Sequence, residues 1–247
     1  MKTLLVVGIG SGNPEHITVQ AINALNRADV LFIPDKGAAK ADLAEVRREI
    51  IARYVTNPAS RSLVYAVPRR DDANPDYEAA VDQWHTDLAG RYSELIAAIP
   101  EGGAGAFLVW GDPGLYDSTL RIIGRLPERE ELHVEVIPGI TAVQALTAAH
   151  AIPLNRIGEP VHITTGRKLD AVEVDSVVML DGRMAFRQAD PELQIFWGAY
   201  LGTADEIIVA GQLGDVADDI VRLRQEARER HGWIMDIYLL RKGEPQD

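Results

Sequence analysis

The residues best able to do chemistry stand where a buried strand breaks off at a Gly-Asp-Pro turn. Residues 106–110 form an apolar run of strand length, and Gly111, Asp112 and Pro113 follow it directly. Such residues stop a strand, so the turn is expected at the carboxyl end of a strand, where open α/β sheets bind ligands. Asp112 is therefore a candidate general base or hydrogen-bond acceptor. The alternative, which the local sequence favours, is an aspartate that only caps its own turn.

Two more turns of this kind follow predicted strands, at residues 8–14 and 138–142. The first, Gly-Ile-Gly-Ser-Gly-Asn-Pro, lacks the Gly-x-Gly-x-x-Gly spacing of dinucleotide-binding folds and the Lys-Ser or Lys-Thr of a P-loop. Glycines at the end of a single strand more often form only a tight turn than a ligand-binding site. Three of them favour a site in which a ligand contacts the main chain.

Histidines and arginines add few further candidates. None of the six histidines forms a His-x-His or His-Glu-x-x-His pair, so no metal site is expected. His16 stands beside the first glycine turn and is a candidate base. The pairs Arg47-Arg48 and Arg69-Arg70 are interpreted as solvated faces, although the second pair closes a strand and offers cations to carboxylates.

The spacing of apolar residues predicts the elements that position these turns. A strand, a helix and a strand follow one another at residues 3–9, 15–29 and 30–33, which is a βαβ unit with parallel strands. Further strands are expected at 62–67, 106–110, 134–137, 161–165, 176–180, 206–210 and 233–240, and helices at 38–54, 77–99, 119–125 and 142–151. Ser118 or Thr119 is expected to cap the helix at 119–125.

A polar segment with a proline, residues 126–132, suits a domain boundary. We therefore expect an α/β protein with two domains. Residues 1–127 would hold a mainly parallel sheet and residues 128–247 a mixed sheet with fewer helices.

The composition excludes several classes of protein. With 25 Lys and Arg against 37 Asp and Glu, the formal charge is −12, which argues against a broad nucleic-acid-binding face. The chain has no cysteine, which excludes disulfides and thiolate catalysis. No run of apolar residues is long enough to span a membrane, and the N-terminus does not resemble a signal peptide. We expect a cytoplasmic protein.

The three turns, taken in order, resemble the motifs of the tetrapyrrole methylase family. The family motif Gly-x-Gly-Pro-Gly-Asp-Pro corresponds to residues 8–14, and its Gly-Asp-Pro-x-x-Tyr-Gly-Ser corresponds to residues 111–118. Its Val-Ile-Pro-Gly-Ile-Ser-Ser corresponds to residues 136–142, and Gly-Ile-Pro-Leu to residues 151–154. The resemblance covers nearly the whole chain, and its specificity comes from several motifs in the right order.

The resemblance implies two α/β domains with a cleft between them, a homodimer, and S-adenosylmethionine as methyl donor with S-adenosylhomocysteine as product. It implies no metal. The cofactor-binding positions that it places on this chain are Ser11, Gly111, Asp112, Pro113, Tyr116, Thr141, Ala142, Leu180, Leu201 and Leu213. Two residues depart from the family pattern: Asn13 replaces an aspartate, and Asp117 replaces a glycine and adds a charge.

Within the family, residues 11–14, 32–36 and 115–119 resemble the enzymes that methylate precorrin-5 at C1 with loss of acetate, giving precorrin-6A in cobalamin biosynthesis. One alternative is a sibling methyltransferase, such as one acting on C20 of precorrin-2, that releases no acetate. Another is a tetrapyrrole-binding protein without catalytic activity. A nucleotide-binding oxidoreductase is disfavoured by the glycine spacing.

The implied reaction assigns roles to polar residues near the turns. Loss of the acetyl group needs a base to activate water, and Asp35, His16 and Asp112 are the candidates. The tetrapyrrole substrate is a small molecule with many carboxylates. Lys36, Arg69 and Arg70 are the cations expected to bind it.

Overall fold

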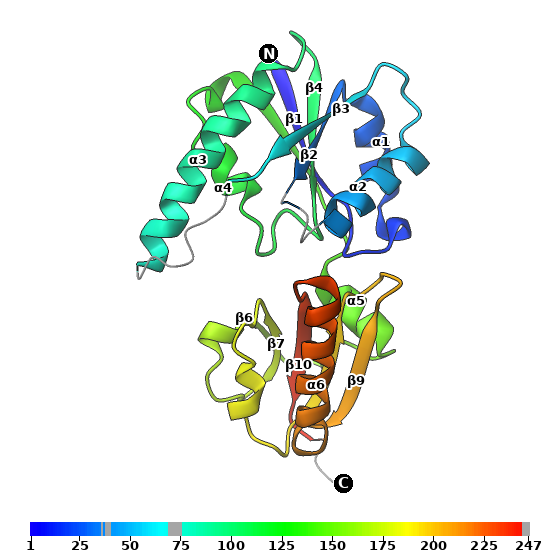
Figure 1. The fold of residues 1–247 in the computed structure, drawn as a ribbon, viewed down its shortest axis with the longest axis vertical. Helices are drawn as coiled ribbons and strands as arrows, with labels where there is room; N and C mark the ends of the chain where they lie inside the picture. Colours follow the sequence, from blue (N-terminus) through cyan, green and yellow to red (C-terminus); the bar gives the residue numbers. More distant parts are fainter. Residues whose placement is uncertain (36, 38–40, 69–75, 244–247) are drawn as a thin grey trace. The chain divides into compact units, whose positions relative to one another are not determined.

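The computed structural model describes residues 1–35, 37, 41–68 and 76–243. The chain divides into two compact units, Met1–Thr141 and Ala142–Asp247 (Figure 1). Each unit is built on a five-stranded sheet. No helix in the described residues combines the length and the hydropathy that a bilayer crossing requires.

The first unit has an all-parallel sheet in the order β3-β2-β4-β1-β5. Its elements are β1 (Lys2–Gly8), α1 (Val19–Arg27), β2 (Val30–Asp35), α2 (Ala41–Tyr54), β3 (Arg61–Ala66), α3 (Tyr77–Ala97), β4 (Ala104–Val109), α4 (Thr119–Ile123) and β5 (Leu132–Ile137). The central strands are apolar on both faces, as expected for a parallel sheet covered by helices on each side.

Alternate side chains of the strands pack into two separate cores. Leu4 and Val6 of β1 belong to the core beneath α3 and α4. Leu5 and Val7 of the same strand belong to the core beneath α1 and α2. Figure 1 shows these helix pairs on opposite faces of the sheet. The two cores fix the strands, so the carboxyl ends of β1, β4 and β5 lie together at one edge.

The second unit has a mixed sheet in the order β6-β7-β10-β8-β9. Its elements are α5 (Ala142–Ala149), β6 (Val161–Thr165), β7 (Asp175–Met179), β8 (Gln194–Ala199), β9 (Ile207–Gln212), α6 (Leu213–His231) and β10 (Asp236–Arg241). Among the described strands of this sheet, only β6 and β7 are parallel neighbours. The core around Trp197 and Tyr238 packs against α6.

The expected organisation differs from the structure in three places. The division between units falls after Thr141, later than residue 127, because β5 pairs with β1 and completes the first sheet. Strand β8 and helix α6 lie in stretches where the sequence analysis placed no element. The α6 stretch has apolar residues at positions 213, 216, 217, 220 and 221, so its helical spacing was present but obscured by its many charges.

Candidate functional site

Three glycines from three loops meet at the carboxyl edge of the first sheet. A Cβ atom built on Gly139 would lie 2.1 Å from the carbonyl oxygen of Gly111 and 2.8 Å from the Cα of Gly8. A Cβ atom on Gly8 would lie 2.6 Å from the Gly139 nitrogen. The backbones are therefore in direct contact, which only glycine permits. The three glycine turns of the sequence form one continuous surface of main chain.

Asp112 holds two of these loops together. Its Oδ1 accepts a hydrogen bond from the Gly114 amide at 2.7 Å, and its Oδ2 accepts one from the Gly139 amide at 2.9 Å. Gly111 also exchanges backbone hydrogen bonds with Gly10 of the first loop. Both carboxylate oxygens are thus engaged by main chain, which favours the turn-bracing role of Asp112 over that of a base.

Replacing Asp112 with asparagine is expected to lower the free energy of unfolding of the first unit by about 1–3 kcal/mol, because one amide donor would then face an NH₂ group. Urea unfolding followed by circular dichroism measures the change. Asp87→Asn is the matched control, since Asp87 is exposed and its partner Gln83 keeps an acceptor. Equal stability of the Asp112 variant and the control would contradict the bracing role.

The first loop contains two buried polar atoms without a partner in the described residues: Ser11 Oγ and His16 Nδ1. Ser11 is 1% exposed. Next to it, Asn13 accepts a hydrogen bond from the Glu15 amide and begins a 3₁₀ turn at Pro14–His16. A buried hydroxyl without a hydrogen-bond partner costs free energy unless a ligand supplies the partner. The first loop therefore offers polar atoms suited to binding a ligand.

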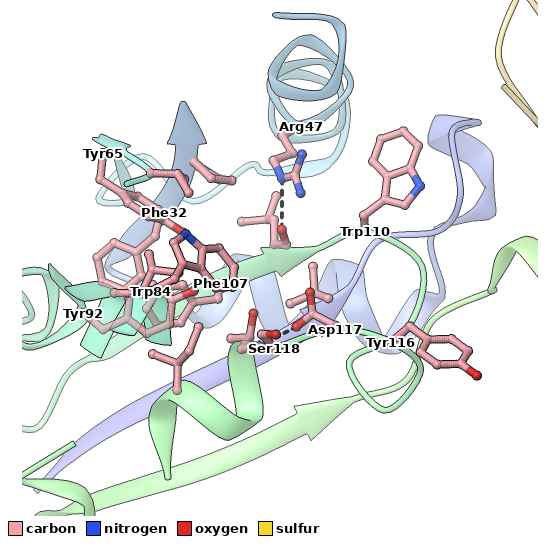
Figure 2. Close-up of a pocket in the computed structure, with 17 residues that line it drawn as sticks. Phe32, Arg47, Tyr65, Trp84, Tyr92, Phe107, Trp110, Tyr116, Asp117 and Ser118 are labelled. Atoms are coloured by element: carbon pink, nitrogen blue, oxygen red, sulfur yellow. Dashed lines mark hydrogen bonds between the residues drawn. The ribbon is translucent and has the colours of Figure 1, made fainter. Parts of the chain in front are cut away.

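A cavity of about 220 Å³ lies beside these loops, within the first unit. Aromatic rings form much of its wall, as Figure 2 shows. The rings are those of Phe32, Tyr65, Trp84, Tyr92, Phe107, Trp110 and Tyr116. Its polar lining is formed by Arg47, Asp117, Ser118 and Thr119. The cavity thus combines aromatic rings with one cation and several polar groups, as small-molecule sites commonly do.

Arg47 contributes the cation of this cavity. It is 5% exposed, and it donates hydrogen bonds from Nε to the Leu108 carbonyl at 3.0 Å and from Nη1 to the Leu43 carbonyl at 2.7 Å. Burial lowers the pKa of Arg47, while Tyr65 and Asp117 oppose this. A guanidinium keeps its charge despite such a shift. The cavity therefore contains a buried positive charge.

The interpretation of Arg47-Arg48 as a solvated pair was wrong for Arg47, and Arg48 alone is exposed. The signal was present in the sequence. Arg47 follows Leu43 by four residues and precedes Ile50 by three, so it lies on the buried face of α2.

Two tyrosines, Tyr65 and Tyr92, line the cavity side by side. The ring of Tyr65 meets that of Tyr92 edge to face, with centroids 6.1 Å apart. Burial raises the pKa of both phenols, so both stay neutral at physiological pH. They present hydroxyl groups without negative charge.

The other residues expected in the first unit are dispersed around these loops. Pro113 is buried, and Tyr116 is 43% exposed at a positive φ of 50°. Figure 2 shows Tyr116 turned away from the other rings. Thr141 follows the Gly139 loop. Asp35 ends β2, is exposed, and accepts a hydrogen bond from the Gly37 amide.

Three expected substrate-binding residues, Lys36, Arg69 and Arg70, lie outside the described residues. Helix α4 is capped differently from the expectation. The cap bond runs from the Thr119 amide to Asp117 Oδ1 at 2.7 Å, and Ser118 makes no side-chain cap.

Four expected cofactor-binding residues belong to the second unit. Leu180 and Leu201 follow β7 and β8, which both run antiparallel to β10, so they lie at the same edge of that sheet. Leu180 is 59% exposed, at a positive φ of 53°. Leu213 follows β9, which runs the other way, and it is buried in the core. The structure thus separates Leu213 from Leu180 and Leu201. Ala142 begins α5.

The described residues contain no group of three or more His, Asp or Glu side chains placed to bind a metal ion. Of the six histidines, His85 and His150 have side-chain hydrogen bonds, to Ser118 and to the Trp197 carbonyl respectively. These contacts were not foreseen from the sequence.

Known proteins share the glycine loops and the two-sheet architecture of this chain. The model of the tetrapyrrole (corrin/porphyrin) methylases matches residues 3–217. The chain belongs to the tetrapyrrole methylase family. The resemblance of the three loops to this family is thereby confirmed, as is the fold of one parallel and one mixed sheet.

Individual members of the tetrapyrrole methylases resemble the chain over almost its full length. Precorrin-6A synthase [deacetylating] from Sinorhizobium sp is 58% identical, covering 98% of this chain and 96% of that protein. The structure of CobF, a cobalamin synthesis related protein from Corynebacterium diphtheriae, superposes with a TM-score of 0.84 at 42% identity, over 98% of this chain and 99% of that one.

A more distant tetrapyrrole methylase shares the fold. Uroporphyrin-III C-methyl transferase from Thermus thermophilus, in complex with S-adenyl homocysteine, superposes with a TM-score of 0.62 at 20% identity, over 97% of this chain and 92% of that one.

Proposed function

We propose that this tetrapyrrole methylase transfers a methyl group from S-adenosylmethionine to C1 of precorrin-5 and releases acetate, giving precorrin-6A. The observation that supports this most is the 58% identity, over nearly the full length of both chains, to a deacetylating precorrin-6A synthase. No insertion or deletion of domain size separates the two proteins, since 98% of one aligns with 96% of the other.

The residues around the glycine loops fit S-adenosylmethionine. When bound, this cofactor supplies a methyl group that its sulfonium already activates. The contact of Gly8 and Gly139 with each other and with the Gly111 carbonyl leaves no room for a Cβ at Gly8 or Gly139, and the buried Ser11 hydroxyl has no partner in the described part of the chain. The residues proposed to hold the cofactor are Ser11, Gly111, Asp112, Pro113, Tyr116, Thr141, Ala142, Leu180 and Leu201. Leu213, which the resemblance also implies, is buried like Leu201 but lies at the opposite edge of the second sheet.

The chain itself contributes alignment and exclusion of water. Because the methyl group is already activated, holding the two reactants in line in a water-free site supplies most of the acceleration. Asp112 positions the loops by accepting hydrogen bonds from two main-chain amides. His16, with a buried unpaired Nδ1, and Asp35 remain the proposed bases among the residues expected from the sequence.

The substrate presents carboxylates to a chain whose formal charge is −12, so local cations must bind them. We add Arg47 to the proposed cations Lys36, Arg69 and Arg70, because its guanidinium lines an aromatic cavity and is buried. The expected homodimer and cytoplasmic location are part of this proposal, and light scattering of the purified protein tests the first.

The test is incubation of the purified protein with S-adenosylmethionine and enzymatically generated precorrin-5, with methylated product measured by mass spectrometry and acetate by NMR. We expect equal amounts of both. Methylation without acetate would reassign the chain to a sibling step of the pathway, such as methylation of precorrin-2. Tetrapyrrole binding without methyl transfer or cofactor affinity would indicate a protein without catalytic activity.

A further inference from the structure

Ser118 and His85 form a serine–histidine pair at the wall of the aromatic cavity. The distance from Ser118 Oγ to His85 Nε2 is 3.0 Å. Ser118 lines the cavity together with Arg47 and Tyr92, and it is half-buried. A serine hydroxyl within hydrogen-bond reach of a histidine nitrogen is the arrangement that activates serine as a nucleophile.

The position of Ser118 in the fold makes this contact unexpected. Ser118 is the N-cap residue of α4, where a serine side chain normally accepts a hydrogen bond from the helix. Here it makes no such bond, and Asp117 Oδ1 accepts from the Thr119 amide. The hydroxyl of Ser118 is therefore not engaged by the helix and is available to His85.

The surroundings of His85 keep its imidazole neutral. His85 is 5% exposed on α3, and its ring lies beside that of Trp84. Burial lowers the pKa of His85, and the nearby guanidinium groups of Arg125 and Arg121 lower it further, against the smaller effect of Asp82. A neutral imidazole is the form that accepts a proton from a hydroxyl group.

The size of the cavity restricts what can reach Ser118. At about 220 Å³, it is smaller than the usual range of about 300–1,000 Å³ for whole-ligand pockets. A tetrapyrrole macrocycle does not fit in this volume, whereas one of its substituents does. The reaction proposed above removes one small substituent, the acetyl group, as acetate.

From this geometry we propose that Ser118, with His85 as its base, accepts the acetyl group of the tetrapyrrole substrate; this rests on the proposed function. Ser118 Oγ bonds to the acetyl carbonyl carbon while its proton passes to His85 Nε2. The bond from that carbon to the macrocycle breaks, and its electron pair stays on the macrocycle carbon. That pair then forms the bond to the methyl group, whose bond to the sulfur of S-adenosylmethionine breaks to give S-adenosylhomocysteine. Water hydrolyses acetyl-Ser118, which frees acetate, and the protons pass to solvent.

The experiment uses the full-length protein with S-adenosylmethionine and precorrin-5 in single turnover, quenched in acid. Peptide mass spectrometry measures acetylation of Ser118, and NMR measures acetate. The variants are S118A, S118C and H85Q. The controls are S62A and H133Q, which change an exposed serine on β3 and an exposed histidine on β5.

We expect the peptide containing Ser118 to be transiently acetylated in the wild type, and the acetyl group to accumulate on S118C as a thioester. S118A should slow both acetate release and methyl transfer by about 10³-fold or more, and H85Q by about 10²-fold or more. Both should keep the wild-type affinity for S-adenosylmethionine, measured by calorimetry, which a merely structural role would not predict. The controls should resemble the wild type.

Acetate release by S118A at the wild-type rate would overturn the assignment of Ser118. So would the absence of an acetylated peptide in both the wild type and S118C while acetate is still formed. In both cases the wild type would still convert precorrin-5, so the proposed function would stand. A wild type that forms neither methylated product nor acetate would overturn the proposed function, and this inference with it.

Discussion

Replacing Gly139 with alanine is expected to abolish binding of S-adenosylmethionine and to lower the free energy of unfolding of the first unit by about 3 kcal/mol or more. The added methyl group would overlap the Gly111 carbonyl oxygen at 2.1 Å and the backbone of Gly8 at 2.8 Å. These atoms belong to main chain at the ends of two strands, so neither can move aside as a flexible side chain does. The loops must separate instead.

Separation of the loops would also break the hydrogen bonds that join them. The Gly139 amide donates to Asp112, and the Gly111 carbonyl accepts from Gly10. Urea unfolding and calorimetric titration with S-adenosylmethionine measure the two effects. Gly90→Ala is the matched control: Gly90 lies in α3, a Cβ added there would meet nothing within 4 Å, and the change should stabilise by up to about 1 kcal/mol. Wild-type stability and affinity in Gly139→Ala would contradict the contact surface.

The glycine loops were predictable from the sequence because their requirements are local. Glycine is required where the backbones of Gly8 and Gly139 touch, and the sequence shows both glycines at the ends of apolar strands. The parallel sheet of the first unit followed from the strand–helix–strand order for the same reason. The boundary after Thr141 did not, because it depends on the pairing of β5 with β1, which are far apart in the chain.

The aromatic cavity was not predicted because it depends on tertiary contacts. Ser118 and His85 are 33 residues apart and meet only because α3 packs against α4. Ser118 ends the motif at residues 111–118 but reads there as a helix cap, and His85 stands in no motif. The bases predicted from the sequence were therefore Asp35, His16 and Asp112. In the second unit, the direction of β9 placed Leu213 at the opposite edge of the sheet from Leu201, and strand direction cannot be obtained from apolar spacing.

Arg47→Met is expected to weaken substrate binding by about 10- to 100-fold, the worth of one hydrogen bond between a buried cation and a carboxylate. Affinity for S-adenosylmethionine should be unchanged, since Arg47 is not among the residues proposed to hold the cofactor. Fluorescence or absorbance titration with the tetrapyrrole measures the first quantity, and calorimetry the second. Methionine preserves most of the side-chain volume, so the aromatic wall should stay in place.

The stability of the variant separates a binding role from a folding role. Burial lowers the pKa of Arg47, so its charge costs free energy in the free protein, and its two hydrogen bonds to main-chain carbonyls offset part of that cost. Removing the charge should therefore change the free energy of unfolding by less than about 1.5 kcal/mol. Arg48→Met is the control: Arg48 is the exposed neighbour on the same helix, paired with Glu45. It should alter neither stability nor affinity. If the two variants bound the substrate equally well, Arg47 would be removed from the substrate site.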